Sequence, residues 1–302
     1  MIEIHEKLYS YGKYINFIKN LYYNKKLPAS IMLIGKGGIG KKSFITHLLL
    51  NIQKNIILTY PQLNNTDFVF HNKNDLNNII NNKHSNIKFV YNLENSSNIT
   101  IDQIREITNY TKQSSFNGES KFIVICNPEN LNIFAANSLL KILENPPQNS
   151  YFILISDSEK SLLSTIKSRC VKFNIKFSYN ETQFILKNLL ADLNLHTSYI
   201  INKFETPGSV VNRLKYITEN NLNKNNDLEI IYFCLNDYRA NKNKSSLIIS
   251  IALLNNFFHK KMLSNFYSIN NSYSIFKNKM IASLGFNSDI NEMINFLKVR
   301  FK

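Results

Sequence analysis

A glycine-rich segment in the N-terminal part of the chain has the residue types and spacing of a phosphate-binding loop. Gly35, Gly37, Gly38 and Gly40 lie close together, and Lys41 follows the last of them. In such a loop the glycines let backbone N–H groups converge on a phosphate at the N-terminus of a helix, and the lysine reaches the terminal phosphates. Half of the chain's eight glycines lie here. The pattern predicts a fold derived from the P-loop proteins.

The residues that would hold magnesium in a working P-loop ATPase are missing. A Ser or Thr normally follows the lysine, because its hydroxyl binds the metal, but here the next residue is Lys42, whose ammonium cannot be a ligand. Ser43 comes one position later, which places it about 100° farther round a helix. An acidic pair should also end a later strand, and the strand that ends here reads Cys126-Asn127. We therefore expect a phosphate cradle without metal machinery.

A displaced catalytic base is the remaining way to rescue ATP hydrolysis. Glu129 is the nearest acidic residue, but Pro128 precedes it and redirects the chain, so we expect Glu129 to be a surface carboxylate. If Ser43 and Glu129 did complete the site, the protein would be an active motor ATPase. This alternative stays open.

Through the first 175 residues, short β-rich apolar runs alternate with helical patterns. The predicted strands are Ser30–Ile34, Lys88–Leu93, Lys121–Cys126, Tyr151–Ser156 and Val171–Ile175. One helix is predicted to begin after Thr100 as its N-cap, and Asn137–Glu144 is predicted to be helical up to the prolines that follow. Such alternation predicts an α/β domain, a parallel sheet with helices on both faces. The polar tract 64–98 is interpreted as a loop-bearing insertion.

Beyond residue 175 the pattern is helical throughout. The predicted helices are Glu181–Leu193, Ser198–Phe204, Ser209–Thr218, Leu228–Tyr238, Ser245–Phe266 and Ile275–Val299. The polar stretch 220–226 is the predicted linker. The chain is thus divided into an α/β domain, residues 1–175, a small helical domain, residues 176–222, and a larger helical domain, residues 223–302.

Composition excludes several classes of protein. With 302 residues, 44% of them apolar, the chain can fill a packed core, which rules out a disordered or fibrous protein. No apolar run approaches the roughly 18 residues that span a bilayer, and the N-terminus does not resemble a signal peptide, so we expect a cytoplasmic protein without a membrane partner. The three cysteines are far apart, which excludes a disulfide framework and a CxxC zinc site. We predict no bound metal.

The net charge of +15 is a weak guide to partners. Only five of the 36 basic residues are Arg, and the rest are Lys scattered through an Asn-rich and Ile-rich sequence. A generally solvated lysine surface explains such a charge as well as a polyanion groove does. A basic DNA-binding module therefore stays open as a further alternative.

Two motifs carry a resemblance to a known family. They are the run Asn137–Pro147 and, after the next strand, Ser168-Arg169-Cys170, and the run Ile101–Arg105 also matches. Together they resemble the AAA+ subunits of the bacterial DNA polymerase III clamp loader. The resemblance spans the α/β part and fades in the helical parts. It implies an AAA+ P-loop domain, a helical lid domain over 176–222 and an all-α collar over 223–302, through which subunits assemble.

The missing groups indicate which subunits of that family the chain resembles. In the tau/gamma motor subunits the P-loop lysine is followed by Thr, the strand ends in Asp-Glu, and a lid helix supplies an Arg. Here the corresponding residues are Lys42, Cys126-Asn127 and Val211. This is similar to the delta-prime subunits, the stators of the loader, which resemble an ATPase but do not hydrolyse ATP.

The resemblance to those stators implies a non-catalytic subunit of the DNA polymerase III holoenzyme with no intrinsic ATPase activity. Its expected partners are tau/gamma motor subunits and a delta subunit in a five-subunit ring, and through the ring the sliding clamp and primed DNA. No cofactor is expected to be required. The loop Gly35–Lys41 is expected to bind ATP or ADP weakly without hydrolysis, or to be vestigial. Because no Cys precedes Cys126, the four-cysteine zinc module of many family members is expected to be absent.

Arg169 is the residue through which the resemblance implies a catalytic role. It would act in trans as an arginine finger on the ATP of a neighbouring motor subunit, an effect worth about 10³–10⁵ in rate in well-studied cases. Its planar fork also argues for this role, since Lys is the usual cation of this chain. Ser168 and Cys170 are expected to shape the turn. A structural Arg that ties the strand edge to a carboxylate is the alternative.

Overall fold

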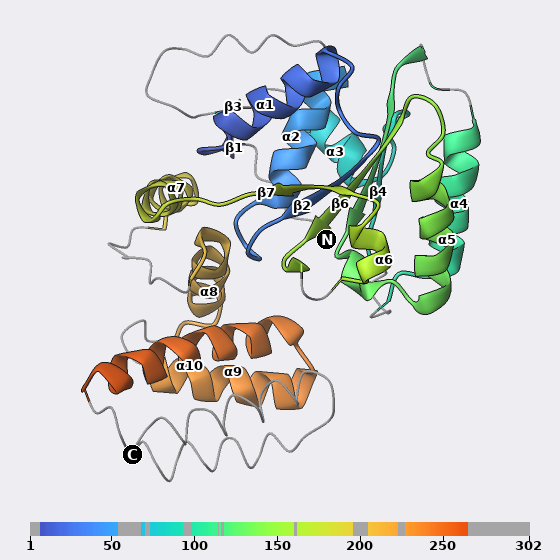
Figure 1. Cartoon of the computed structure of the whole chain (residues 1–302). Coiled ribbons are helices and arrows are strands. Elements are labelled where there is room, and N and C mark those ends of the chain that lie inside the picture. The colour runs from blue at the N-terminus through green and yellow to red at the C-terminus, as the bar shows by residue number, and fades with distance from the viewer. Residues whose placement is uncertain are drawn as a thin grey trace. The chain divides into compact units, whose positions relative to one another are not determined.

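The computed structural model of the chain describes residues 7–53, 68–69, 73–92, 98–113, 115, 118–159, 162–195, 205–222 and 227–264. The chain divides into two compact units, residues 1–181 and 182–302. Figure 1 shows the elements of both units. The predicted helices 198–204 and 275–299 lie outside the described residues. The division of the second unit into lid and collar stays a prediction.

The first unit is built on a five-stranded sheet in the order β4-β5-β6-β2-β7, and every neighbouring pair is parallel. These strands are β2 (Ser30–Ile34), β4 (Ile87–Val90), β5 (Lys121–Cys126), β6 (Ser150–Ser156) and β7 (Val171–Asn174). The predicted parallel sheet of an α/β P-loop fold is confirmed. The strand predicted to extend to Leu93 ends at Val90. The predicted bounds of the other four strands of the sheet agree with the structure to within one residue.

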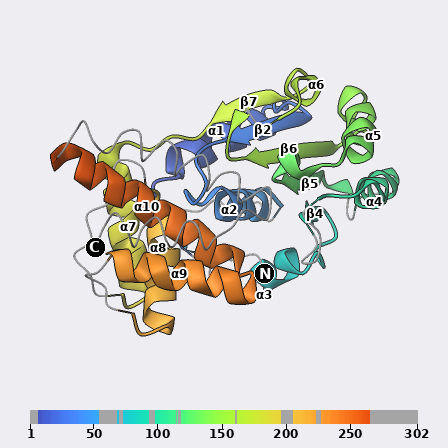
Figure 2. The same ribbon diagram turned by 90° about the horizontal axis from the view of Figure 1, so that it is seen from below.

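Helices cover both faces of this sheet, as the alternation of strands and helices predicts. The helices are α1 (Gly12–Tyr23), α2 (Lys41–Gln53), α3 (Lys73–Ile80), α4 (Ile101–Lys112), α5 (Ile133–Glu144) and α6 (Ser164–Lys167). Successive residues of a strand point to opposite faces, so Ile31 and Leu33 pack with α1, α2 and α3, whereas Met32 and Ile34 pack with α4, α5 and α6. Figure 2 shows α2 on one side of the strands and α4 and α5 toward the other.

Local capping explains where the two helices of the family motifs begin. Thr100 and Gln103 form a capping box at the start of α4, in which Gln103 Oε1 accepts from the Thr100 N–H at 3.0 Å. The predicted N-cap is confirmed. Helix α5 begins at Ile133, four residues before the predicted start at Asn137, because the Asn132 side chain accepts from the Ala135 N–H at 2.7 Å and so caps the helix earlier.

Several described elements of this unit lie outside the sequence-based expectations. They include α1, α3, the short α6 and a two-stranded antiparallel sheet of β1 (Lys7–Leu8) and β3 (Phe68–Val69). Helix α3 lies within the tract 64–98, interpreted as a loop-bearing insertion. Its residues Leu76 and Ile79 are three positions apart, so both face the core and are buried.

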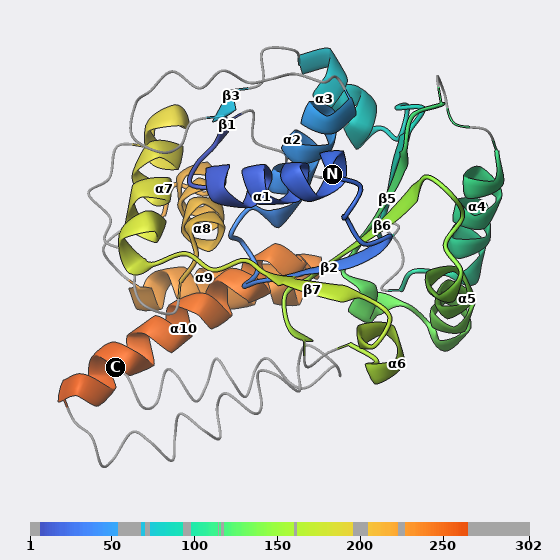
Figure 3. The ribbon, with the colours of Figure 1, turned by 45° about the horizontal axis from the view of Figure 1, so that its top comes forward.

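The described part of the second unit is helical. Helix α7 (Tyr179–Asp192) begins just before the boundary, and α8 (Pro207–Glu219), α9 (Asp227–Asn241) and α10 (Lys244–Ser264) follow. Helices α9 and α10 lie side by side (Figure 3) and share a core that includes Ile231, Leu235 and Leu254, to which Ile217 of α8 also belongs. No helix in the described ranges is long and apolar enough to cross a bilayer.

A buried polar cluster joins α8 to α10 within the second unit. The Arg213 guanidinium donates to Glu205 Oε1, and Asn256 Nδ2 donates to the same oxygen at 2.7 Å. The side chains of Arg213 and Glu205 are only 5% and 4% exposed. Because a buried charge is tolerated only when it is paired and hydrogen-bonded, this cluster holds the two helices in one arrangement.

Candidate functional site

The phosphate loop lies at the carboxyl edge of the parallel sheet. The strand register aligns Ile34 of β2 with Ser156 of β6, and Cys126 of β5 with Ile155 of β6. Residues that directly follow these three strands therefore meet at one edge, where ligands of open α/β sheets bind. The Gly35 N–H donates to the Ser156 carbonyl at 3.3 Å, which joins the start of the loop to the end of β6.

The loop has the backbone conformation that its glycines allow. Gly38 and Gly40 have φ values of 79° and 93°, in the left-handed region that favours glycine. Tyr11 fixes the far side of the loop, because its hydroxyl donates to the Ile39 carbonyl at 2.9 Å and its ring stacks on Phe44 with the centroids 4.6 Å apart. The loop is thus held in place by side chains of this chain alone.

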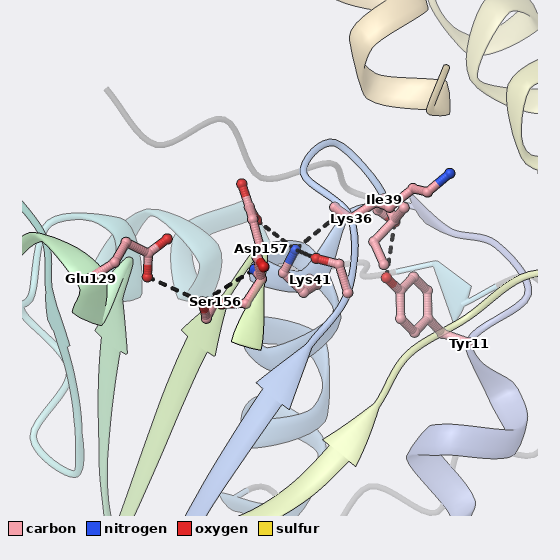
Figure 4. A network of polar contacts seen from close by, with 9 residues as sticks. Tyr11, Lys36, Ile39, Lys41, Glu129, Ser156 and Asp157 are labelled. Atoms are coloured by element: carbon pink, nitrogen blue, oxygen red, sulfur yellow. Dashed lines mark hydrogen bonds and ion pairs between the residues drawn. The ribbon is translucent and has the colours of Figure 1, made fainter. Parts of the chain in front are cut away.

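Lys41, the lysine expected to reach a terminal phosphate, is engaged inside the protein. Its side chain is 5% exposed, and Nζ donates to Gly35 O at 2.6 Å, to Lys36 O at 2.9 Å and to Asp157 Oδ1 at 2.7 Å. Figure 4 shows the Asp157 carboxylate pointing from the end of β6 to this ammonium. An ammonium has three N–H donors, and each of the three has an acceptor here.

The second carboxylate oxygen of Asp157 lies against the loop backbone. A Cβ atom built on Gly37 would lie 2.7 Å from Asp157 Oδ2, closer than real Cβ contacts allow. Only glycine fits beneath this carboxylate without displacing it. The Asp157 carboxylate therefore pairs with the lysine of the phosphate loop through one oxygen, and its other oxygen leaves no room for a Cβ on Gly37, while its side chain is 53% exposed.

The positions that bind magnesium in a P-loop ATPase hold no suitable ligand in this structure. Ser43 is 4% exposed, inside α2. Burial raises the pKa of Cys126 to about 11, which keeps the thiol protonated and a poor metal ligand at neutral pH. Among the described residues, no group of three or more His, Cys, Asp or Glu could hold a metal ion.

Glu129 differs from the expected surface carboxylate. It lies in a short 3₁₀ helix, η2 (Pro128–Asn130), directly after β5, and it is partly buried. The Ser156 hydroxyl donates to its Oε2 at 3.1 Å. Burial raises the pKa of Glu129, and the charge of Asp157 adds to this, although the bond from Ser156 opposes it. The correction has a simple cause, since η2 turns the chain back over the end of β6 instead of leading it away (Figure 4).

Arg169 lies in the turn between α6 and β7, where two groups of the chain hold its guanidinium. Nε donates to Glu144 Oε1 at 2.9 Å, Nη2 forms an ion pair with the same oxygen, and Nη1 donates to Thr165 O at 3.0 Å. The side chain is 32% exposed. Glu144 is the last residue of α5 and belongs to the motif that carries the family resemblance.

The neighbours of Arg169 have positions that suit turn formation. The Ser168 hydroxyl donates to Thr165 O at 3.0 Å, at the end of α6. Cys170 is buried, and burial raises the pKa of its thiol to about 11, so at neutral pH the thiolate that could act as a nucleophile is scarce.

The structure brings only part of the predicted site together. Gly35, Gly37 and Lys41 meet at the sheet edge, whereas Arg169 is bonded to Glu144, Thr165 and Ser168. Sequence reasoning missed Asp157. A signal existed, because Asp157 directly follows a predicted strand, but only the strand order shows that this strand adjoins β2.

The third position at which a group of the motor subunits is missing lies in the second unit. Val211, which stands where the resemblance implies an Arg in motor subunits, is 1% exposed within α8. Arg213, two residues later, could be thought a displaced substitute. It is engaged in the buried pair with Glu205, so its guanidinium already has a partner within the second unit.

Comparisons with known proteins agree with the resemblance. A family model described as DNA polymerase III, delta subunit, matches residues 11–178. The chain is 36% identical over 107 residues to DNA polymerase III subunit delta' of Buchnera aphidicola subsp. Baizongia pistaciae, which covers 35% of this chain and 31% of that protein. It is 40% identical over 90 residues to the subunit delta' of Haemophilus influenzae, covering 30% and 28%. The aligned segments thus span about a third or less of these relatives.

A solved structure resembles the whole chain more distantly. It is a DNA polymerase III gamma subunit-related protein from Thermotoga maritima, with a TM-score of 0.49 and 16% sequence identity, and the superposition covers 93% of this chain and 97% of that one.

Proposed function

The chain belongs to the DNA polymerase III delta-subunit family, and we propose that it is a non-hydrolysing stator, of the delta-prime type, in the clamp loader of that polymerase. In this role it joins tau/gamma motor subunits and a delta subunit in a five-subunit ring. The ring loads the sliding clamp on primed DNA, and this subunit supplies Arg169 to the ATP of the neighbouring motor subunit.

The observation that carries the non-hydrolysing part of the proposal is the state of Lys41. Its three donors are bonded within the chain, to Gly35, Lys36 and Asp157. Ser43 is buried and Cys126 is protonated at neutral pH, so neither offers a ligand for magnesium. These features also weigh against the alternative of an active motor, because that reading needs the Ser43 hydroxyl at the metal.

The exposure of Arg169 supports the role in trans. Its side chain is 32% exposed, and the side chain of its ion-pair partner Glu144 is 46% exposed. A pair this open to water is worth only about 0–1 kcal/mol. A phosphate group carries more charge than one carboxylate and accepts the same planar fork, so it can replace Glu144 when a neighbour's ATP approaches. Until then Glu144 orients the guanidinium.

The proposal is tested on the assembled clamp loader. All motor sites except the one next to this subunit are inactivated by substituting their P-loop lysine, so that ATP turnover reports on a single site. We expect Arg169→Ala to lower that turnover by about 10³-fold, the lower end of known arginine fingers, while the complex still assembles. Arg105→Ala is the matched control, because Arg105 is exposed and pairs with Asp102 in its own helix.

Two results would contradict the proposal. Unchanged turnover with Arg169→Ala would assign Arg169 to the structural role of tying its turn to α5. Magnesium-dependent hydrolysis by the purified chain alone would refute the stator role, and the loss of that activity in Ser43→Ala or Glu129→Ala variants would identify the chain as a motor.

A further inference from the structure

The Asp157 carboxylate lies at the phosphate loop in a position that a bound anion could take. One oxygen accepts from Lys41 Nζ at 2.7 Å, and the other lies where a Cβ on Gly37 would be 2.7 Å away. Lysine and loop glycine are the groups that receive a terminal phosphate in a P-loop. A carboxylate has two negatively charged oxygens on a planar carbon, so it can occupy part of the space that this phosphate would fill.

We propose that Asp157 is the internal anion of this phosphate loop, and that its carboxylate keeps nucleotide phosphates out. The proposal concerns the loop alone and does not depend on Arg169 or on assembly into a ring. It goes beyond the stator role, because a stator can fail to hydrolyse ATP and still bind it.

Charge balance explains why the loop needs an internal anion. The Lys41 side chain is almost fully buried, and a buried ammonium without a counter-charge is unfavourable. In an ATPase the bound nucleotide supplies that negative charge. Here Asp157 supplies a negative charge to the buried ammonium, from a side chain that is itself 53% exposed.

The same residues oppose an incoming phosphate. A nucleotide would have to displace the Asp157 carboxylate from Lys41, since the ammonium has no further donor. The displaced carboxylate would stay close, together with Glu129, whose pKa Asp157 already raises by its charge. A phosphate would therefore meet two carboxylates where an ATPase offers a magnesium ion.

The experiment measures phosphate binding by the full-length chain without magnesium, with a fluorescent ADP as the probe. We expect Asp157→Asn to bind the probe about tenfold or more tightly than the original chain, because the neutral amide no longer competes with phosphate for Lys41 by its charge. Lys41→Met introduced with Asp157→Asn should remove the gain. Glu159→Gln is the matched control. Glu159 is an acidic residue that follows β6, as Asp157 does, but it pairs with Lys172.

A second measurement covers the case in which Asp157→Asn folds poorly. The variant leaves the Lys41 ammonium without its anion, so its melting temperature should fall in chloride and be restored by pyrophosphate at equal ionic strength. The original chain should show no such response. Equal affinity of the original chain and Asp157→Asn, or a melting temperature of the variant that ignores pyrophosphate, would overturn the proposal.

Failure of this proposal and failure of the stator role give different results. An original chain that binds ADP as tightly as the variant without hydrolysing ATP would refute the internal anion and leave the stator role intact. ATP hydrolysis by the original chain would refute the stator role.

Discussion

Lys41 and Arg169 are both cations held by a carboxylate of their own chain, yet they lie in opposite environments. Lys41 is 5% exposed and donates to two backbone carbonyls as well as to Asp157. Arg169 is 32% exposed, and Glu144 is its ion-pair partner. The Lys41 ammonium is bonded to groups of its own fold, whereas the more exposed Arg169 guanidinium can exchange its partner. The two cations thus differ in exposure, with Lys41 bonded inside the phosphate loop and Arg169 more open to solvent.

Removing each cation tests this difference most strongly. Lys41→Met should lower the free energy of unfolding by about 2 kcal/mol, because two carbonyls and a carboxylate lose their donor. Arg169→Met should lower it by only about 0.5 kcal/mol, as is usual for exposed pairs. Urea unfolding of the full chain, followed by circular dichroism, measures both. Equal losses would show that the two ion pairs do not differ in the way their exposure indicates.

Crowding the buried site gives a smaller effect. Gly37→Ala places a Cβ atom 2.7 Å from Asp157 Oδ2, so the carboxylate must move, at a cost of about 1 kcal/mol in the same unfolding measurement. Gly12→Ala is the control, because no atom lies within 4 Å of its Cβ position. A Gly37→Ala variant as stable as the control would mean that Asp157 does not rest on the loop.

Removing the charge at the exposed site should change stability less still. Glu144→Gln keeps the size of the side chain and one acceptor oxygen, so we expect a loss of about 0.5 kcal/mol or less. In the single-site ATPase assay the same variant should raise KM more than it changes kcat if Glu144 only orients Arg169 before the neighbour binds. A loss of kcat as large as that of Arg169→Ala would give Glu144 a direct part in turnover.

The smallest expected effect concerns pH. Burial raises the pKa of Glu129 above its ordinary value of 4.5, so the folded chain binds this proton more strongly than the unfolded chain does. The stabilisation from this proton is present below pH 4.5 and is lost as the pH rises through the raised pKa. Glu129→Gln should remove that part of the pH dependence in unfolding curves taken from pH 4 to pH 7. An unchanged pH profile would contradict the burial of Glu129.

Strands β2, β5 and β6 could be predicted because they are largely apolar runs buried on both faces, whereas β7 is a mostly exposed strand at the sheet edge. Helix α3 was not predictable in the same way, since Leu76 and Ile79 are buried among several polar residues, counting the positions of the helix whose side chains the structure describes. Helix α5 was predicted too short, because its start depends on one side-chain bond from Asn132. Such single contacts leave little trace in hydrophobic periodicity.

The phosphate loop itself was predictable, because its residues are adjacent in the sequence. Asp157 was not, since it lies 116 residues beyond Lys41 and joins it only through the pairing of β6 with β2. Glu129 was misjudged for a related reason. The proline before it does end the strand, but the direction of the chain afterwards is set by η2 and by the hydroxyl of Ser156.

The buried cluster of Glu205, Arg213 and Asn256 has a mechanical consequence. Separating α8 from α10 would break the hydrogen bond from Asn256 Nδ2 to Glu205 Oε1, whereas the ion pair of Arg213 with Glu205 would stay within the α8 segment. A hydrogen bond to a charged group is worth about 1.5–3 kcal/mol. Helix α10 is thus tied by one amide to a charge that is already balanced, so a change at Asn256 can loosen the junction without unpairing that charge.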